Sequence, residues 1–255
     1  MLALCALAAP PALRAQDGDF DIELEQMPYF GTGAGYVRLF MFVDYEGMNS
    51  ISRPFGLGDF SGPFNMDIGG LMFTPGLVPN LRVGLFAGSG TKQISRPVEV
   101  GAEKTLYTRT IYFNDVVISS QIDYALPLSD ALAVFAGGFL GVGRYTFGAS
   151  QTRGGGENFS MVFPADVFHG DSVANLTNFN RFARQISYHV FVCPMVNMEY
   201  TLTPNIMVRA GAGYNASFRL DNWSDEGGVD IIDPPSISAN GVFLQAGVFV
   251  GLFQH

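Results

Sequence analysis

Charge is scarce in this sequence, and lysine is almost absent. Charged residues make up 15% of the 255 residues, well below the roughly 25% of ordinary soluble domains. Acidic residues outnumber basic ones by 23 to 14, which gives a net charge of −9, and the only lysines are Lys92 and Lys104. The sequence therefore offers no basic patch, and we expect no nucleic-acid partner.

Cysteine and long hydrophobic runs are scarce as well. Beyond residue 16, no stretch approaches the roughly 18 uncharged apolar residues that indicate a membrane-spanning helix. The two cysteines are Cys5 and Cys193, and neither a CxxC motif nor a cysteine–histidine spacing typical of a metal site occurs. Cys5 lies in a leading segment that we expect to be removed, so no internal disulfide is predicted for the mature chain.

Hydrophobic residues are nevertheless abundant, at 48% of the sequence, and they are distributed as alternation. The last segment, NGVFLQAGVFVGLFQH, is the clearest example. Alternate residues from Val242 to Leu252 are all aliphatic, whereas the intervening set includes Phe243, Gln245 and Phe249. A period of two residues indicates a β-strand. Because neither face is polar enough for water, we expect the aliphatic face to contact lipid.

Eight alternating segments bounded by turn residues can be recognised along the chain. Most are long enough to supply the roughly 9–11 residues with which a tilted strand crosses a bilayer. They span residues 33–45, 62–74, 81–95, 105–126, 132–149, 185–202, 206–220 and 240–253.

Short and long connections alternate strictly between these segments. The short ones are the proline-containing turns PGLVPN, PLSDA and TPN, and the long ones cover residues 46–61, 96–104, 150–184 and 221–239. In an up-and-down barrel this order places every short turn at one end and every long loop at the other. Outer-membrane barrels have this arrangement and an even number of strands.

This architecture resembles the small eight-stranded outer-membrane β-barrels of the OmpA, OmpX and OmpW type over about residues 30–255. The predicted fold is all-β: an eight-stranded antiparallel up-and-down transmembrane β-barrel with short periplasmic turns and long outer loops. The resemblance implies location in the cell outer membrane, with membrane lipid and the barrel-insertion machinery as partners. We also expect a monomer. Members of the family usually end in Phe, whereas here Gln254 and His255 follow Phe253.

The chain start suggests a division into three parts. Residues 1–15 resemble a secretory signal peptide, with an apolar run followed by a cleavage region near Ala15 and Gln16, although the basic region usual at its start is missing. Residues 16–32 form an N-terminal lead segment, and residues 33–255 form the barrel. The rival fold is a soluble sandwich or lipocalin-like barrel, which would need apolar inward and polar outward faces.

The polar residues of each strand are expected to face the lumen. Arg82, Asp123, Glu199 and Arg209 lie within a few residues of short turns, so they should meet at one depth. Arginine suits bidentate pairing with carboxylates, and we predict a structural charge cluster that plugs the lumen, with a gated ion or proton path as the alternative. The same reasoning assigns further polar residues to the lumen: Arg38, Asp44, Asn65, Asp67, Asp115, Gln121, Arg144, His189, Asn197, Asn215, Ser217, Arg219 and Gln245.

No catalytic residue, cofactor site or metal site is predicted. His169, Asp171 and Ser172 lie together in the longest outer loop, but proximity in sequence does not establish a triad. The acidic segment 221–233 offers oxygen ligands, but its spacing does not match an EF-hand. We therefore expect no enzymatic activity and no cofactor.

A structural or surface-interaction role in the outer membrane, with a plugged lumen that is not a porin channel, is the function best supported by these features. Glycines on inward faces favour an alternative, in which the barrel binds or transports a small apolar ligand. A third possibility is an outer-membrane lipid-modifying enzyme.

Overall fold

The computed structural model describes residues 29–100, 104–153, 181–225, 227–231 and 237–254. The predicted signal peptide at 1–15 and most of the lead segment at 16–32 lie outside these residues. Strands dominate the described part, and the first begins at Phe30, three residues before the predicted start of the barrel. The strands are β1 (Phe30–Val43), β2 (Phe64–Phe73), β3 (Leu81–Val100), β4 (Thr105–Pro127), β5 (Leu132–Arg153), β6 (Arg181–Thr203), β7 (Ile206–Arg219), β8 (Ser224–Asp225) and β9 (Gly241–Gln254).

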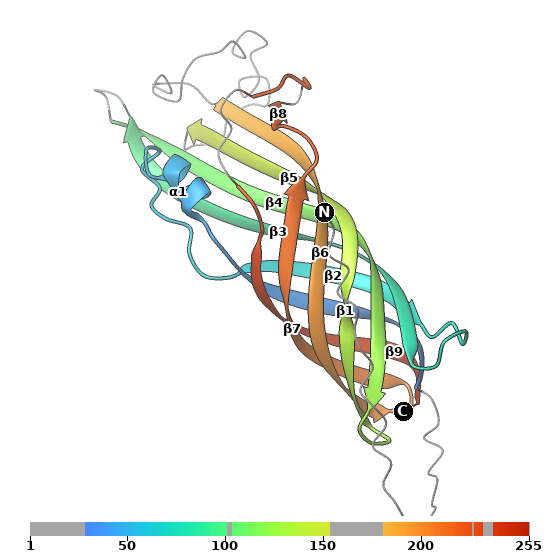
Figure 1. Cartoon of the computed structure of the whole chain (residues 1–255). Coiled ribbons are helices and arrows are strands. Elements are labelled where there is room, and N and C mark those ends of the chain that lie inside the picture. Colours follow the sequence, from blue (N-terminus) through green and yellow to red (C-terminus); the bar gives the residue numbers. More distant parts are fainter. Residues whose placement is uncertain (1–28, 101–103, 154–180, 226, 232–236, 255) are drawn as a thin grey trace, which may run out of the picture.

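Eight of these strands form a closed ring. Each pairs antiparallel with its two neighbours in the order β1, β2, β3, β4, β5, β6, β7 and β9, and β9 returns to β1. The two-residue strand β8 adds to the edge of β6 at the long-loop end (Figure 1). The eight-stranded up-and-down barrel predicted from the sequence is therefore confirmed.

The register of the ladders sets the tilt of the strands. Starting at Arg38, the paired residues lead through β9 and β7 to Met198 of β6. In the other direction they lead through β2, β3, β4 and β5 to Tyr188 of the same strand. The circuit thus closes with a shift of ten residues, from 188 to 198, along β6. A shear larger than the strand number goes with the strong tilt, roughly 35–45°, of small barrels.

Short turns and long connections lie at opposite ends of the barrel, as predicted. The C-terminal end of the chain lies at the short-turn end, whereas α1 (Glu46–Ser52) and β8 lie at the other (Figure 1). The predicted loop at 96–104 is wrong, because β3 and β4 continue to pair as far as Val100 and Thr105. Pro97 is tolerated there because β2 has already ended, which leaves β3 as an edge strand.

Residues 44–63 cover the long-loop end of the barrel. Asn49 accepts a hydrogen bond from the Phe60 backbone N–H at 2.7 Å, and the Tyr45 ring stacks on Phe60 with centroids 5.9 Å apart. Burial raises the pKa of Tyr45 to about 12. On the outer surface of this segment, Arg53 forms ion pairs with Glu46 and Asp59, each at 2.8 Å. Among the described residues, no helix combines the length and apolar character needed to cross a membrane.

The prediction for the faces of the last strand is confirmed. The aliphatic side chains from Val242 to Leu252 point outward and are exposed, whereas Phe243, Gln245 and Phe249 are buried in the lumen. The other strands also expose aliphatic and aromatic side chains, and together these form an apolar belt around the barrel. The belt includes Leu71, Leu85, Ile118, Ile122, Leu140, Val142, Val192, Val196, Met198, Ile206, Val248 and Val250.

Phenylalanines fill the middle of the lumen, and glycines on the facing strands make room for them. Phe86 packs edge to face against Phe139 and Phe249, with centroids 5.3 and 6.3 Å apart. A Cβ at Gly70 would overlap the Phe86 ring, whereas one at the neighbouring, outward Gly69 would meet no heavy atom closer than the Gly35 carbonyl oxygen at 3.8 Å.

The two glycines therefore make a matched test of lumen packing. Gly70→Ala should lower the free energy of unfolding by about 1–3 kcal/mol, because the added methyl group forces the Phe86 ring to shift. Gly69→Ala, one residue away on the same strand, should have little effect. Urea unfolding of both variants measures the difference. Equal effects would mean that β2 does not present Gly70 to the lumen.

Candidate functional site: the polar groups of the lumen

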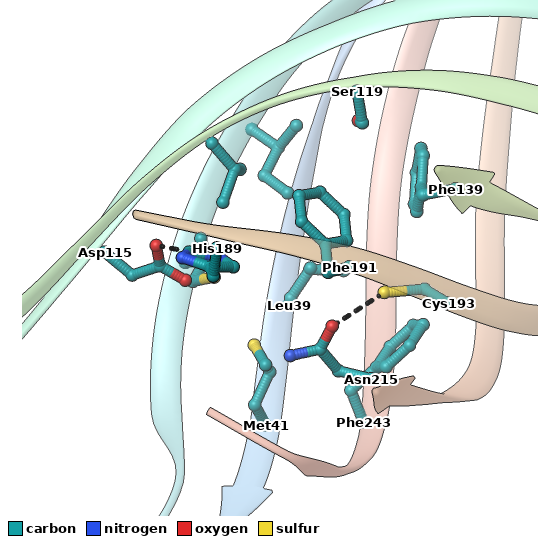
Figure 2. A pocket seen from close by; sticks show the side chains of 13 residues that line it. Leu39, Met41, Asp115, Ser119, Phe139, His189, Phe191, Cys193, Asn215 and Phe243 are labelled. Carbon is teal, nitrogen blue, oxygen red and sulfur yellow. Dashed lines mark hydrogen bonds and ion pairs between the residues drawn. The ribbon is translucent and has the colours of Figure 1, made fainter. Parts of the chain in front are cut away.

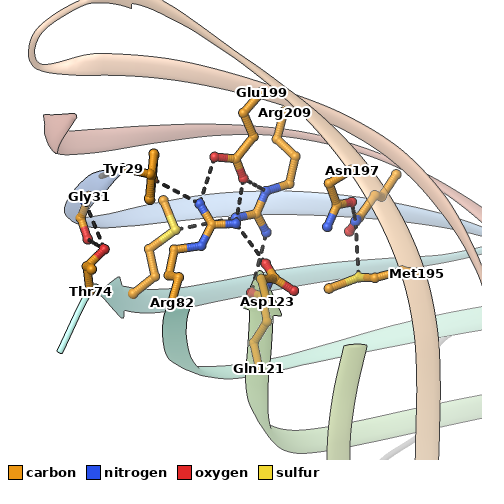
Figure 3. A network of polar contacts seen from close by, with 12 residues as sticks. Tyr29, Gly31, Thr74, Arg82, Gln121, Asp123, Met195, Asn197, Glu199 and Arg209 are labelled. Atoms are coloured by element: carbon orange, nitrogen blue, oxygen red, sulfur yellow. Dashed lines mark hydrogen bonds and ion pairs between the residues drawn. The ribbon is translucent and has the colours of Figure 1, made fainter. Parts of the chain in front are cut away.

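Two polar groups lie inside the barrel, one toward the long-loop end (Figure 2) and one near the short turns (Figure 3). The second contains the four charged residues predicted from the sequence. Arg82 and Asp123 are direct partners in the β3–β4 ladder, and Glu199 and Arg209 are direct partners in the β6–β7 ladder. All four side chains are at most 2% exposed.

Ion pairs connect these four side chains into one network (Figure 3). Arg82 donates to both carboxylate oxygens of Glu199, at 2.7 Å each, and also to Asp123 Oδ2 at 2.7 Å. Arg209 Nε donates to Glu199 Oε1 at 2.7 Å. Glu199 therefore joins the two arginines, and two positive charges are balanced by two negative ones.

Neutral and aromatic side chains surround the charges. Gln121 donates to Asp123 Oδ2, and Tyr29 OH lies 3.1 Å from Arg82 Nη1. Arg82 also lies over the Phe135 ring, with its Cζ 3.8 Å from the centroid, and Arg209 lies over Phe249 at 4.4 Å. Such stacking suits the weakly hydrated guanidinium group. The arrangement holds buried charge in place and fills the cross-section of the lumen.

The polar group toward the long-loop end surrounds a cavity in the lumen (Figure 2). Asp115 Oδ1 and His189 Nε2 are 3.6 Å apart, and the His189 ring stacks on Tyr145 with centroids 3.8 Å apart. Farther along the cavity, Cys193 donates to Asn215 Oδ1 at 3.0 Å. The cavity has about 20 Å³ of space, enough for about one water molecule.

The outer end of the lumen is closed by residues that follow β7. Trp223, Ile237 and Ala239 are almost completely buried. Tyr145 OH donates to Ser217 Oγ at 2.7 Å, and Asn215 Nδ2 donates to the Ala239 carbonyl oxygen at 2.7 Å. The segment before β9 is thus attached to the inner faces of β5 and β7.

The structure buries most of the other polar residues that were assigned to the lumen. Those that are less than 9% exposed are Asp115, Gln121, His189, Asn197, Asn215, Ser217 and Gln245. Tyr29 and Tyr145, which were not assigned to the lumen, are also buried there. An aromatic residue near a strand end can lie either at a membrane surface or in a lumen, and only its face on the strand distinguishes the two places.

The inward assignment is wrong for six residues. Arg38 and Asp67 point outward and pair with each other, because β1 and β2 turn aliphatic and methionine side chains to the lumen and leave their polar residues outside. Asn65 shares the outward face with Asp67, and Arg144 shares one with the exposed Val142. The remaining two lie beyond or at the long-loop end: Asp44, which accepts a hydrogen bond from the Glu46 N–H, and the exposed Arg219.

Two acidic residues of the 221–233 segment accept hydrogen bonds from nearby groups of the protein. Asp221 accepts hydrogen bonds from Ser187 Oγ and the Tyr188 N–H, at 3.0 and 2.7 Å, and Asp225 accepts from two backbone N–H groups of its own turn. Within the part of the chain that the structure describes, no three His, Cys, Asp or Glu side chains gather as metal ligands would. His169, Asp171, Ser172, Glu226 and Asp233 lie outside the described residues.

Comparison with known proteins gives matches of structure only. No family model matches the chain, and no curated protein matches its sequence. Among solved structures, a major outer membrane protein of Thermus thermophilus is similar with a TM-score of 0.44 and 15% identity, over 87% of this chain and 99% of that one. The attachment invasion locus protein Ail of Yersinia pestis matches with a TM-score of 0.30 and 10% identity, over 89% and 97%.

A third match corrects the prediction that the chain is not an enzyme. The outer-membrane protease OmpT of Escherichia coli matches with a TM-score of 0.29 and 10% identity, over 89% of this chain and 93% of that one. Because a protease is among the matching barrels, the barrel fold does not exclude catalysis. At this identity the match assigns no activity to the present chain.

A double-mutant cycle on Glu199→Ala and Arg209→Ala tests the charge network. Each single substitution should lower the free energy of unfolding by about 3–5 kcal/mol, because it leaves the buried network with one uncompensated charge. The double variant should cost less than the sum, because Arg82 and Asp123 still balance each other. Urea unfolding from lipid vesicles gives the four stabilities. The control cycle is Glu46→Ala with Arg53→Ala, an exposed pair of similar geometry, which should show little coupling. Simple additivity at 199 and 209 would show that these two residues do not share a buried site.

Proposed function

We propose that this protein resides in the outer membrane as a β-barrel with a side-chain-filled lumen, and that its role is structural or in surface interaction. The observation that carries the proposal is the apolar belt. Aliphatic side chains are exposed on the outside of the barrel, whereas charged side chains are buried inside it. Val250 and Leu140 are 60% and 64% exposed, whereas Glu199 and Asp123 are completely buried. A soluble barrel requires the reverse arrangement, whereas a closed barrel in lipid also satisfies its backbone hydrogen bonds internally.

The filled lumen supports a role other than passage of solutes. An eight-stranded barrel has room for side chains or one small ligand. Here the ion-pair network occupies one level of the lumen, and phenylalanines packed edge to face occupy the next. The cavity beside Asp115 and His189 matches the size of a water molecule. This size favours the plugged barrel over the transport of a small apolar ligand.

The long-loop end supports the proposed surface role. There β3 and β4 extend as a hairpin well beyond the last residue with which β2 pairs, Gly90. Its exposed side chains are mainly polar or charged, and they include Thr91, Gln93, Ser95, Arg96 and Glu99. An ordered, polar sheet held above an apolar belt offers a surface that faces water while the belt anchors the protein.

Val248→Arg tests residence in a bilayer. Val248 is 45% exposed within the aliphatic face of β9, and an arginine facing lipid near the membrane midplane costs roughly 2–4 kcal/mol. The matched control is Leu106→Arg, which changes a residue with 54% exposure at the far end of the β3–β4 hairpin and should leave stability nearly unchanged. Unfolding in urea from lipid vesicles measures both. Equal stability losses would contradict membrane residence of the belt.

Planar-bilayer recording tests the plugged lumen. The purified protein should insert and show little or no steady conductance, because charged and aromatic side chains fill the cross-section near the short turns. Insertion is verified separately by the slower or faster migration of unheated samples relative to heated ones on gels. Large, stable, porin-like openings from a single barrel would refute the filled lumen.

A further inference from the structure

One ion pair lies on the outer wall of the barrel. Arg38 on β1 and Asp67 on β2 are direct ladder partners, with Arg38 Nε 3.7 Å from Asp67 Oδ1 and side chains 45% and 53% exposed. Tyr36 OH donates to the same carboxylate oxygen, and the Arg38 guanidinium lies 6.0 Å from the centroid of Phe40. We call Tyr36, Arg38 and Asp67 the wall patch.

The wall patch lies within the apolar belt. Along β1, the exposed side chain of Phe42 lies beyond Arg38 and that of Phe30 lies before it. On β9, Arg38 pairs with Ala246, which stands between the exposed Leu244 and Val248. Charged side chains that face lipid at such a level are costly and mark functional positions in membrane proteins.

Small residues surround the patch. Gly69 pairs with Tyr36, Ala87 pairs with Gly69, and Ser89 pairs with Asp67. A Cβ at Gly69 would meet only the Gly35 carbonyl oxygen, at 3.8 Å, which is an ordinary van der Waals distance. Small residues allow two backbones to approach closely within a membrane, as they do where membrane helices associate. Beside the patch, the outer wall of β2 and β3 therefore carries only small side chains, unlike the wall of β6, where Val192, Val196 and Met198 are exposed.

We propose that the wall patch is the contact at which two copies of this chain associate side by side in the membrane. One base and one acid lie at nearly the same depth on neighbouring strands, so the patch is self-complementary. A two-fold axis parallel to the barrel axis sets Arg38 of each protomer against Asp67 of its partner, as an isologous interface requires. The zero net charge of the pair disfavours an anionic lipid headgroup. This inference replaces the expectation of a monomer, and it rests on the proposed residence in a bilayer.

Charge reversal tests the association. In Arg38→Asp the patch is wholly acidic, and in Asp67→Arg it is wholly basic, so each variant alone should lose self-association through repulsion. Mixed together, the two variants should associate with each other. Two differently tagged full-length chains are co-expressed, extracted in mild detergent or native nanodiscs, and purified through one tag. Wild type should retain the second tag, each single variant should not, and the mixed pair should recover it.

A steric variant provides a second test that does not depend on whether the charge variants fold. Gly69→Phe adds bulk to the outward, open side of β2 and should abolish co-purification without altering any charge. The control is Ala136→Phe, which adds the same bulk to an exposed alanine on β5, four strands around the ring from β1, and should leave co-purification at the wild-type level. Folding of every variant is checked by its migration on gels without heating and by extraction from the membrane fraction.

The outcomes separate this inference from the proposed membrane residence. A wild type that needs detergent but stays monomeric in nanodiscs overturns the dimer and leaves membrane residence intact. Charge variants that still self-associate also overturn the dimer. Bound phospholipid that is lost only from Arg38→Asp overturns the dimer in favour of a lipid site. A protein that is soluble without detergent overturns both.

Discussion

The pairing of β1 with β9 is the constraint on which the rest of the molecule depends. Fourteen residue pairs, from Phe30 with Gln254 to Val43 with Gly241, join the two ends of the described chain and remove the sheet edges that would otherwise remain. Closure with eight strands and a shift of ten residues fixes a narrow lumen. Everything placed in that lumen must therefore fit against side chains from the opposite wall, and every charge must find its partner there.

The charge network follows from this narrowness. The short turns PLSDA and TPN hold β4 to β5 and β6 to β7 in fixed register, so residues a few positions from these turns come to one depth. Because the lumen is narrow at that depth, Arg82 reaches across from β3 to Glu199 on β6 at 2.7 Å. A wider barrel would leave these side chains separated by water. The buried pairs do not need to add net stability to be retained, since the loss of one partner costs far more than the pair contributes.

How much could be predicted depended on how strongly each strand distinguishes its two faces. On β9 and β7 one set of alternate residues is aliphatic or small, so the sequence alone assigned Val248 to the outside and Arg209 to the inside. On β1 and β2 both sets are largely apolar, and the single charge on each strand, Arg38 or Asp67, predicts the wrong inward face. The structure buries Val37, Leu39, Met66 and Ile68 instead. Polarity alone cannot assign a face when polar residues can pair on the outside.

The candidate site shows the same dependence on context. Arg82, Asp123, Glu199 and Arg209 were recognisable because charge is rare in this chain and because all four lie near short turns. Tyr29 and Tyr145 were not, since a tyrosine satisfies its hydroxyl equally at a membrane surface or beside a buried polar group. The hairpin extension of β3 and β4 was missed because its alternation continues with polar residues, which a loop also favours.

Two charged groups of this barrel are each neutral overall, and they lie at different distances from the barrel axis. Inside, two arginines and two carboxylates form one group, and the narrow lumen supplies both the partners and the exclusion of water. Outside, Arg38 and Asp67 form a neutral pair in which each side chain remains about half exposed. The inner charges find partners on the opposite wall of the lumen. The outer pair faces no opposite wall of the same chain. A second barrel would supply one, which is the physical reason why a self-complementary ion pair on a lipid-facing wall favours association between copies.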